Sequence, residues 1–205
     1  GTSAEWPPFE TVDENGDYVG FDIELMTAIA DIAGFDIEWA NVTFDSLFVG
    51  LEAGEFDLVI SATTITEERE EQADFSNVYF HASQVMAVRG GDETVASPDD
   101  LPGLKVGVQR GTTGDFAVTD IEGAEVLRYD DVNMAFQALA NEDVDVVVAD
   151  GPTADEIVAK NPELDVMVVG EPFTDEYYGI PVRSGYPELL DAVNAALAQV
   201  IEDGT

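Results

Sequence analysis

The sequence predicts an α/β fold with two lobes. Apolar stretches of strand character alternate with amphipathic helical patterns, first over residues 20–62 and again over residues 104–169. Two further extended stretches, near 84–90 and 177–183, are expected to run between the lobes. The apolar fraction of 45%, arranged in periodic segments, argues against a disordered acidic chain.

The first β/α run begins with an amphipathic helix over 21–33, for which Asp22 is the expected N-terminal cap. Residues 35–42 alternate in polarity as a strand does, a helix follows over 45–53, and residues 57–62 form an apolar strand. This order predicts a mostly parallel sheet in the first lobe.

Two aromatic side chains, Trp6 and Phe9, flank a pair of prolines near the start of the chain. Because proline lacks the backbone donor, residues 3–10 are expected to form an irregular, stiff loop. The two rings either close the edge of the core or form the wall of a pocket.

The second run repeats the alternation over a longer stretch. Its expected strands are 104–109, 124–129, 144–149 and 164–169, and its expected helices are 115–118, 131–140 and 152–160, with a closing helix over 187–201. The glycine-rich break after residue 89 marks a lobe boundary. We therefore expect lobe 1 to comprise 1–86 with 181–205, and lobe 2 to comprise 87–180.

The charge is extreme: 7 Lys and Arg stand against 44 Asp and Glu, a formal net charge of -37. Such self-repulsion strains a compact fold in dilute buffer but is screened at molar salt, which predicts a protein from a halophile. The lack of a basic patch argues against nucleic acid or an anionic membrane as partner. The sequence has no cysteine, which excludes disulfides and thiolate metal sites.

The first candidate site is the stretch Thr63-Thr64-Ile65-Thr66-Glu67-Glu68-Arg69, which follows the apolar strand 57–62. Thr66 is a natural N-cap for a short helix, and Arg69 is unusual in a first turn, where the helix dipole favours acids. An arginine beside hydroxyls and free N–H groups suits a carboxylate or phosphate. The alternative is an ordinary surface arginine.

Other candidates lie where strands of an α/β sheet end, which is where such folds bind ligands. These ends carry Ser61 to Thr64, Arg110 to Thr113, and Asp150. A guanidinium for a carboxylate and Asp150 for an ammonium together describe an α-amino acid. The alternative for Asp150, Thr112 and Thr113 is helix capping, which does not exclude ligand contact.

Several motifs in order along nearly the whole chain resemble the extracytoplasmic solute-binding proteins of polar amino-acid ABC transporters, such as glutamine-binding and lysine/arginine/ornithine-binding proteins. The matching runs are Trp6-Pro7-Pro8-Phe9-Glu10, Gly20-Phe21-Asp22-Ile23-Glu24-Leu25, Thr64-Ile65-Thr66-Glu67-Glu68-Arg69, Asp74-Phe75-Ser76, Val108-Gln109-Arg110-Gly111-Thr112-Thr113-Gly114, Val148-Ala149-Asp150 and Tyr178-Gly179-Ile180.

This resemblance implies a periplasmic-binding-protein-like type II fold, whose two lobes close on the ligand around a two-stranded hinge. It implies that Arg69 binds the ligand's α-carboxylate and Asp150 its α-ammonium. The further ligand-binding residues that it implies or leaves as candidates are Trp6 and Phe44, which would enclose the ligand side chain, and Ser61, Ala62, Thr64, Gln109, Thr112, Thr113 and Tyr178.

The expected function is to bind a free amino acid outside the cytoplasm and deliver it to an ABC permease. Ser3 stands where basic-selective relatives often have an acid, so a polar neutral or acidic amino acid is favoured. We expect a monomer without cofactor or metal, at the cell surface or in the periplasm, attached by a lipid anchor on a segment outside this sequence.

Two other functions stay open from the sequence. A few proteins of the resembling fold are prephenate or arogenate dehydratases, but the sequence has one histidine, His81, and no zinc, nucleophile-elbow or Walker motif. The same fold also serves as the sensor domain of receptors or channels. We expect no enzyme activity.

Overall fold

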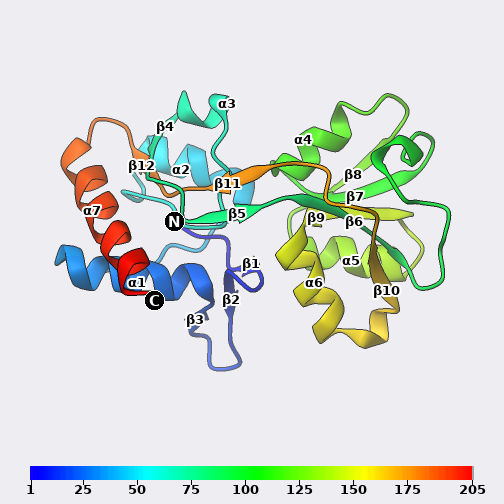
Figure 1. The fold of residues 1–205 in the computed structure, drawn as a ribbon, viewed down its shortest axis with the longest axis horizontal. Coiled ribbons are helices and arrows are strands. Elements are labelled where there is room, and N and C mark those ends of the chain that lie inside the picture. The colour runs from blue at the N-terminus through cyan, green and yellow to red at the C-terminus, as the bar shows by residue number, and fades with distance from the viewer. Residues whose placement is uncertain (205) are drawn as a thin grey trace. The chain divides into compact units, whose positions relative to one another are not determined.

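The computed structural model describes residues 1–204 and separates into two compact units. The first unit comprises Gly1–His81 and the chain from Glu176 onward, and the second comprises Ala82–Asp175 (Figure 1). These divisions lie five residues before the expected boundaries after 86 and 180. The difference has a structural reason, because β6 (Gln84–Arg89) is an integral strand of the second unit's sheet.

In the first unit, α1 (Phe21–Ala33) packs against α7 (Pro187–Asp203), and their apolar faces share one buried cluster. Both helices end at a glycine in the left-handed conformation, which is a common way for a helix to end. A second cluster forms under η1 (Phe44–Ser46) and α2 (Leu47–Ala53). The expected helix over 45–53 is therefore present, with a 3-10 first turn.

The prediction that residues 35–42 and 57–62 form regular strands of a mostly parallel sheet is wrong. Each segment takes part only in isolated bridges within the described chain, Asn41 with Thr2 and Leu58 with Val182. Backbone hydrogen bonds accompany these bridges: Thr2 N donates to Ala40 O, and Val59 N donates to Pro181 O. Nearby, β4 (Ala73–Phe75) pairs antiparallel with β12 (Pro181–Arg183).

The opening stretch is also more regular than expected. β1 (Glu5–Trp6) pairs antiparallel with β2 (Glu10–Val12), which pairs with β3 (Tyr18–Val19). The two prolines lie in the turn between β1 and β2, where no ladder donor is required of them. The prediction that residues 3–10 are irregular is therefore wrong for Glu5, Trp6 and Glu10, and it holds for the turn that contains the prolines.

The second unit is an α/β layer structure whose sheet has the order β10-β6-β9-β7-β8. β7 (Lys105–Gln109) runs parallel to β8 (Glu125–Tyr129) and to β9 (Val146–Asp150), whereas β6 and β10 (Val166–Val169) are antiparallel additions. Every residue of β9 is buried, as a central strand covered on both faces must be.

Three helices of the second unit follow the strands that position them: α4 (Thr113–Thr119) follows β7, α5 (Val132–Ala140) follows β8, and α6 (Gly151–Lys160) follows β9. Single-turn helices cover Pro98–Asp100 and Pro162–Leu164. The starts of α4 and α6 thus lie beyond the carboxyl ends of neighbouring parallel strands, where α/β sheets bind ligands.

Two paired segments, β5 (Phe80–Ala82) and β11 (Glu176–Tyr178), lie where the chain passes from one unit to the other. Tyr178 is fully buried in an aromatic cluster of the first unit, with its ring centroid 5.3 Å from that of Phe9 and 5.5 Å from that of Phe80. This packing assigns β11 to the first unit.

Candidate functional site

The arginine singled out in the sequence is buried, with 5% of its surface exposed, so the surface alternative is wrong. It lies in the short helix α3 (Glu67–Glu70), whose N-cap is Thr66, and the Thr66 hydroxyl accepts from Arg69 N at 3.2 Å. This cap was predicted from the sequence. It fixes the turn from which the guanidinium extends.

The Arg69 guanidinium lies against two aromatic rings. Its central carbon is 5.4 Å from the Phe44 ring centroid and 5.6 Å from that of Phe48, and Nη1 donates to Thr64 O at 2.7 Å. A buried cation in such surroundings favours an anionic partner strongly, because water screens it little. The group is therefore suited to bind a carboxylate.

Two buried acids form hydrogen bonds with Ser61 and Ala62, in the segment before α3. Asp22 Oδ2 accepts from Ala62 N at 2.7 Å and from the Tyr79 hydroxyl at 2.9 Å, while Glu10 Oε1 accepts from the Ser61 hydroxyl at 2.7 Å. Asp22 was expected to cap α1, but Gly20 is the N-cap and makes no side-chain bond there. The Asp22 side chain instead ties α1 to the candidate binding segment.

Burial raises the pKa of the Asp22 carboxyl to about 6, against the bonds from Ala62, Tyr79 and Glu10, which lower it. Burial and the nearby Asp22 charge raise the pKa of Tyr79 well above its ordinary value. Ala62 has a φ of 44°, in the left-handed region, and its N–H is taken by Asp22. That N–H, one of the expected ligand contacts, is thus used inside the protein.

The remaining predicted residues of the first unit are buried as well. The Thr64 hydroxyl donates to Glu176 Oε2 at 2.7 Å, and Thr64 also forms a backbone bridge to Tyr178. Trp6 is 6% exposed, and its indole Nε1 has no hydrogen-bond partner among residues 1–204. An indole N–H in this position is a donor that a ligand can use.

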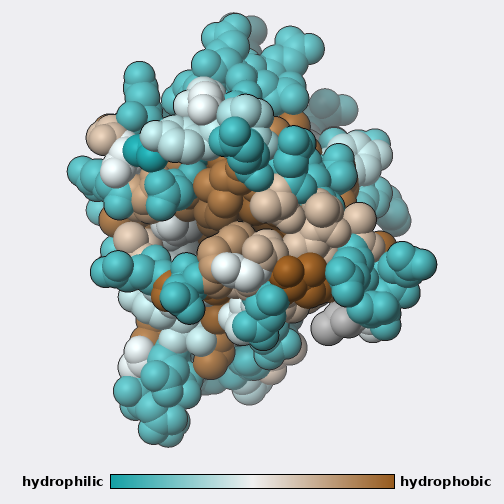
Figure 2. Space-filling model, turned by 90° about the vertical axis from the view of Figure 1, so that its left-hand side faces the viewer, coloured by the Kyte–Doolittle hydropathy of each residue, from teal (hydrophilic) through white to brown (hydrophobic). Residues whose placement is uncertain are grey.

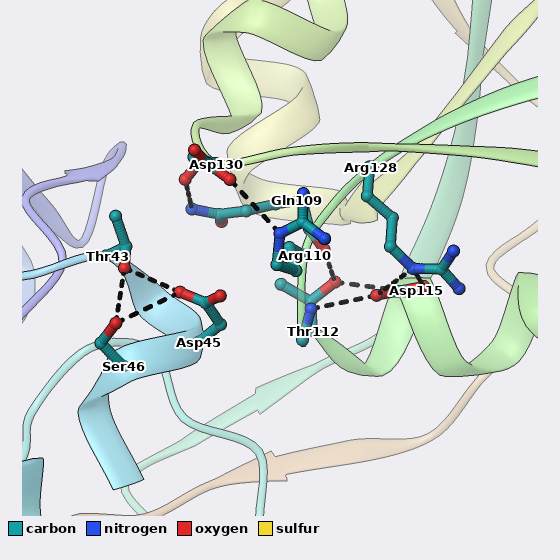
Figure 3. A network of polar contacts seen from close by, with 10 residues as sticks. Thr43, Asp45, Ser46, Gln109, Arg110, Thr112, Asp115, Arg128 and Asp130 are labelled. Atoms are coloured by element: carbon teal, nitrogen blue, oxygen red, sulfur yellow. Dashed lines mark hydrogen bonds and ion pairs between the residues drawn. The ribbon is translucent and has the colours of Figure 1, made fainter. Parts of the chain in front are cut away.

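In the second unit, the turn after β7 forms the polar network drawn in Figure 3. The Thr112 hydroxyl donates to Gln109 O at 2.9 Å and accepts from Asp115 N at 3.2 Å, so the capping interpretation of Thr112 is confirmed. Asp115 also accepts from Gly111 N at 3.0 Å and pairs with Arg128 at 2.9 Å. These bonds make the turn rigid.

Two more polar side chains flank this turn. The Gln109 amide donates to Asp130 O at 3.0 Å, and its buried Oε1 has no partner within the described part of the chain. Arg110 is about half exposed and pairs with the Asp130 carboxylate at 3.3 Å (Figure 3). In the first unit, the same figure shows the hydroxyls of Thr43 and Ser46 bonded to each other at the start of η1.

The Asp150 carboxylate ends β9 and is 3% exposed. It stands at the N-cap position of α6 but makes no side-chain capping bond, so the capping alternative does not describe this carboxylate. Instead, Oδ1 accepts from Gln84 Nε2 at 2.6 Å, and the same amide reaches Thr113 Oγ1 at 3.2 Å. Sequence reasoning missed Gln84, because no local pattern links positions that lie 66 residues apart.

Each unit thus gathers its own part of the predicted set. The first unit holds Trp6, Phe44, Ser61, Ala62, Thr64, Arg69 and Tyr178, and the second holds Gln109, Thr112, Thr113 and Asp150. Besides Gln84, the sequence missed Phe48 and Glu176, whose contacts with Arg69 and Thr64 depend on tertiary packing.

A separate cavity of about 550 Å³ lies in the first unit and is lined mainly by apolar side chains, among them Phe35, Ile37, Trp39, Phe56 and Leu58. None of the predicted binding residues lines it, and it offers no arginine or lysine within the described chain. Figure 2 shows a face of the molecule on which apolar side chains gather in the middle and hydrophilic ones surround them. The lining of the cavity includes four acidic residues but, among the residues that the structure describes, no guanidinium or lysine ammonium that could bind the carboxylate of a zwitterion.

Within residues 1–204, no cluster of three or more His, Cys, Asp or Glu could hold a metal ion. No helix of the described chain is long and apolar enough to cross a membrane.

A family described as bacterial extracellular solute-binding proteins, family 3, matches residues 1–205. The chain belongs to this family. A probable histidine-binding protein of Neisseria gonorrhoeae is 40% identical over 99% of this chain and 77% of its own length. ABC transporter arginine-binding protein 1 of Escherichia coli (strain K12) is 35% identical over 100% of this chain and 85% of its own.

Among solved structures, the fold of this family member matches an ancestral arginine-binding protein bound to arginine. The TM-score is 0.97 at 44% identity, covering 100% of this chain and 92% of the other. An ancestral arginine-binding protein bound to glutamine matches with a TM-score of 0.96 at 45% identity, covering 100% and 91%. The predicted α/β fold of the periplasmic-binding-protein type II class is thereby confirmed, and the relatives named here are binding proteins.

Proposed function

We propose that this family 3 solute-binding protein binds a polar L-α-amino acid through Arg69 and Asp150 and delivers it to an ABC permease. Amino-acid binding for ABC transport is the function class of its relatives, and an extracytoplasmic location accords with the family description. The proposal adds the residues that hold the ligand. The dehydratase and sensor alternatives receive no support from the relatives named above.

The observation that carries the proposal is the buried guanidinium of Arg69 between the rings of Phe44 and Phe48. A fork of N–H donors binds a carboxylate through two parallel hydrogen bonds, and aromatic walls exclude the water that would weaken them. In the second unit, the buried carboxylate of Asp150 is the corresponding acceptor for an ammonium group. Together the two groups satisfy both charges of a zwitterion, and leaving either unpaired costs several kcal/mol.

The next question is which amino-acid side chain the ligand carries. The relatives are named for histidine and arginine, and the structure of an ancestral arginine-binding protein holds glutamine in one case. We therefore rank basic amino acids first and glutamine next. Ser3 argues against a basic ligand, because an acid at this buried position would favour a cation and Ser3 offers only a hydroxyl. Neutral amino acids therefore stay among the candidate ligands.

We further propose that the protein works in concentrated salt, that it functions as a monomer, and that a lipid anchors it at the outer face of the membrane. The support for the first is the net charge of -37. Mass spectrometry of the protein isolated from its native membrane tests the anchor: a diacylglyceryl modification supports it, and its absence contradicts it.

The direct test is titration calorimetry with L-arginine, L-histidine, L-lysine, L-glutamine and L-glutamate in high salt. The unaltered chain is expected to bind one of the first four with a micromolar or lower Kd. Arg69→Ala and Asp150→Ala are each expected to weaken that binding by 100-fold or more, on the order of the 3 kcal/mol lost when one partner of a buried pair is removed.

Matched controls are Arg183→Ala in the first unit and Asp155→Ala at the surface of α6, both outside the proposed set. They are expected to leave the Kd unchanged. Circular dichroism verifies that each variant is folded. Near-wild-type affinity in a folded Arg69→Ala or Asp150→Ala variant would refute the proposed roles.

A further inference from the structure

Gln84 faces Asp150 because of the strand register. It is the first residue of β6 and pairs directly with Asp150, the last residue of β9. In the neighbouring pair, Gly151 N donates to Ser83 O, so Gln84 and Asp150 form the non-hydrogen-bonded pair of this antiparallel ladder. Side chains are closest together in such pairs, which explains why the amide meets the carboxylate.

Both donor hydrogens of the Gln84 amide go to residues of the proposed ligand site. Nε2 lies 2.6 Å from Asp150 Oδ1 and 3.2 Å from Thr113 Oγ1. The side chain is fully buried, and the shorter bond ends on a carboxylate, so it is a charge-assisted bond in surroundings of low dielectric. One side chain thus fixes the carboxylate and the hydroxyl at the same time.

The amide has only one workable orientation. Turning it over would set Oε1, an acceptor, against the Asp150 carboxylate, which is also an acceptor. In the observed orientation, Oε1 is buried, has no partner within residues 1–204, and lies where a Cβ on Gly114 would approach it at 2.6 Å. The missing side chain at Gly114 therefore makes room for this orientation.

The backbone of Gln84 is held as firmly as its side chain. Its N–H donates to Thr174 Oγ1 at 2.7 Å, and its carbonyl accepts from Phe173 N at 3.1 Å. Residue 84 therefore connects β6, the end of β9, the start of α4 and the 173–174 segment. A rotation of the amide would break its bonds to Asp150 and Thr113, at the end of β9 and the start of α4.

We propose that Gln84 is a positioning residue for amino-acid binding: its amide orients the Asp150 carboxylate toward the ligand's ammonium. The inference rests on the proposed function, in which Asp150 receives the ammonium. Gln84 itself acts through Asp150 and Thr113. Loss of the Gln84 amide should therefore weaken the binding of ligands that carry an α-ammonium and leave the binding of ligands without one nearly unchanged.

The first experiment compares the unaltered chain with Gln84→Met, which keeps the length of the side chain and removes both donors. The probes are L-arginine and des-amino-arginine, which lacks only the α-ammonium, measured by calorimetry in high salt. If the panel above selects L-glutamine, the pair is L-glutamine and its des-amino counterpart. Gln84→Met is expected to lower the affinity for the amino acid by roughly 10- to 100-fold, which is the usual effect of losing a hydrogen bond to a charged group. The affinity for the des-amino compound is expected to fall by less than about threefold.

The matched control is Gln137→Met, an exposed glutamine on α5 of the same unit, which is expected to change neither affinity. A second variant, Gln84→Glu, distinguishes the proposed role from a folding defect. Its new carboxyl repels the Asp150 carboxylate when ionised and donates a hydrogen bond to it when protonated. Its affinity for L-arginine is therefore expected to recover toward the wild-type value as the pH falls from about 7 to about 5, relative to the unaltered chain.

The outcomes separate the two proposals. Equal losses for the amino acid and its des-amino counterpart in Gln84→Met would indicate a general structural role and overturn the inference. So would wild-type affinity in Gln84→Met when Asp150→Ala has lost binding, and in that case the proposed function stands. If Asp150→Ala binds normally, the role of Asp150 fails, and the inference falls with it.

Discussion

At the scale of single residues, the buried acids under the Ser61–Ala62 turn are the clearest case of structure that no local pattern indicates. The motif Gly20-Phe21-Asp22 predicts a helix start, and the helix does start there. The carboxylate of Asp22, however, leaves the helix end and accepts from Ala62 N and the Tyr79 hydroxyl. This contact joins residues 40 positions apart and holds a non-glycine residue at positive φ beside the candidate site.

The pKa of Asp22 leads to a prediction about pH. Its value of about 6 lies above the ordinary 3.8, so the folded state binds the proton more tightly than the unfolded state. This carboxyl therefore contributes stability that is fully present below about pH 4 and is lost as the pH rises through about 6. The rise from 3.8 to about 6 corresponds to a loss of about 3 kcal/mol at most, and the polar side chains that face this carboxyl are Glu10 and Tyr79.

Asp22→Asn removes the titration and keeps one acceptor oxygen for Ala62. We expect its free energy of unfolding to fall less than that of the wild type between about pH 4 and about pH 7. The control is Asp31→Asn. Asp31 is an exposed acid on the same helix, so this substitution removes one charge without changing the buried contacts of Asp22. Urea titrations at fixed ionic strength measure the difference. If the wild type and both variants decline in parallel, the buried carboxyl does not titrate as described.

At the scale of elements, the entrance to α1 depends on a glycine. Gly20 has a φ of 128°, and a Cβ there would collide with the carbonyl group of Phe9. The end of the same helix, Gly34, also has positive φ, but a Cβ there meets nothing within 4 Å. The two positions therefore separate backbone strain alone from strain combined with a steric collision.

Gly20→Ala is expected to destabilise the fold by about 3 kcal/mol or more, because the β1–β2 turn and the helix start must move apart. Gly34→Ala, with the strain of a left-handed residue alone, is expected to cost about 1 kcal/mol. Thermal and urea unfolding monitored by circular dichroism measure both values. Equal losses in the two variants would mean that the contact of Gly20 with Phe9 relaxes without cost.

Elements were predictable from the sequence where a local rule decides them. The Thr66 cap, the apolar strand β9 and the helices of the second run follow from side-chain pattern and capping chemistry, and the structure confirms them. The expected strands 35–42 and 57–62 are not regular strands, because a ladder requires a paired neighbour along its length. Within the described chain, their pairing is limited to the isolated bridges of Asn41 with Thr2 and of Leu58 with Val182.

The candidate site was predictable in part, for the same reason. Arg69, Asp150 and the threonines stand at turns and helix starts that the sequence marks, so their types and positions could be proposed. Gln84, Glu176 and Phe48 act through contacts between distant segments, and only the strand register and the packing reveal them. The residues that support a site are therefore harder to find from sequence than the residues that form it.

At the scale of the whole molecule, the dominant feature is electrostatic. The net charge is -37 on 205 residues, and several of the few cations are already paired with acids, as Arg89, Arg128 and Arg183 are. The pairs of Arg89 and Arg183 are partly exposed, and such pairs contribute little, about 1 kcal/mol or less each. We therefore expect ions from the solvent to reduce the repulsion between acids in the folded state.

This repulsion predicts a strong dependence of stability on salt. The Debye length falls from about 10 Å at 0.1 M salt to about 3 Å at 1 M, so repulsion between acids on neighbouring elements is largely removed over this range. The unfolded chain relieves the same repulsion by expanding, and it therefore gains less from screening. We expect the thermal midpoint to rise steeply between about 0.1 M and about 1 M sodium chloride, and more slowly above that concentration.

Two controls identify the cause of such a rise. Tetramethylammonium chloride screens charge as sodium chloride does, and sucrose is excluded from the protein surface without screening it. If repulsion is the cause, both salts raise the midpoint in the low range, whereas sucrose at equal osmolality gives a small, nearly linear rise. A midpoint that stays constant from about 0.1 M to about 1 M salt would contradict the proposed adaptation to brine, because the acidic surface would then be compensated within the fold itself.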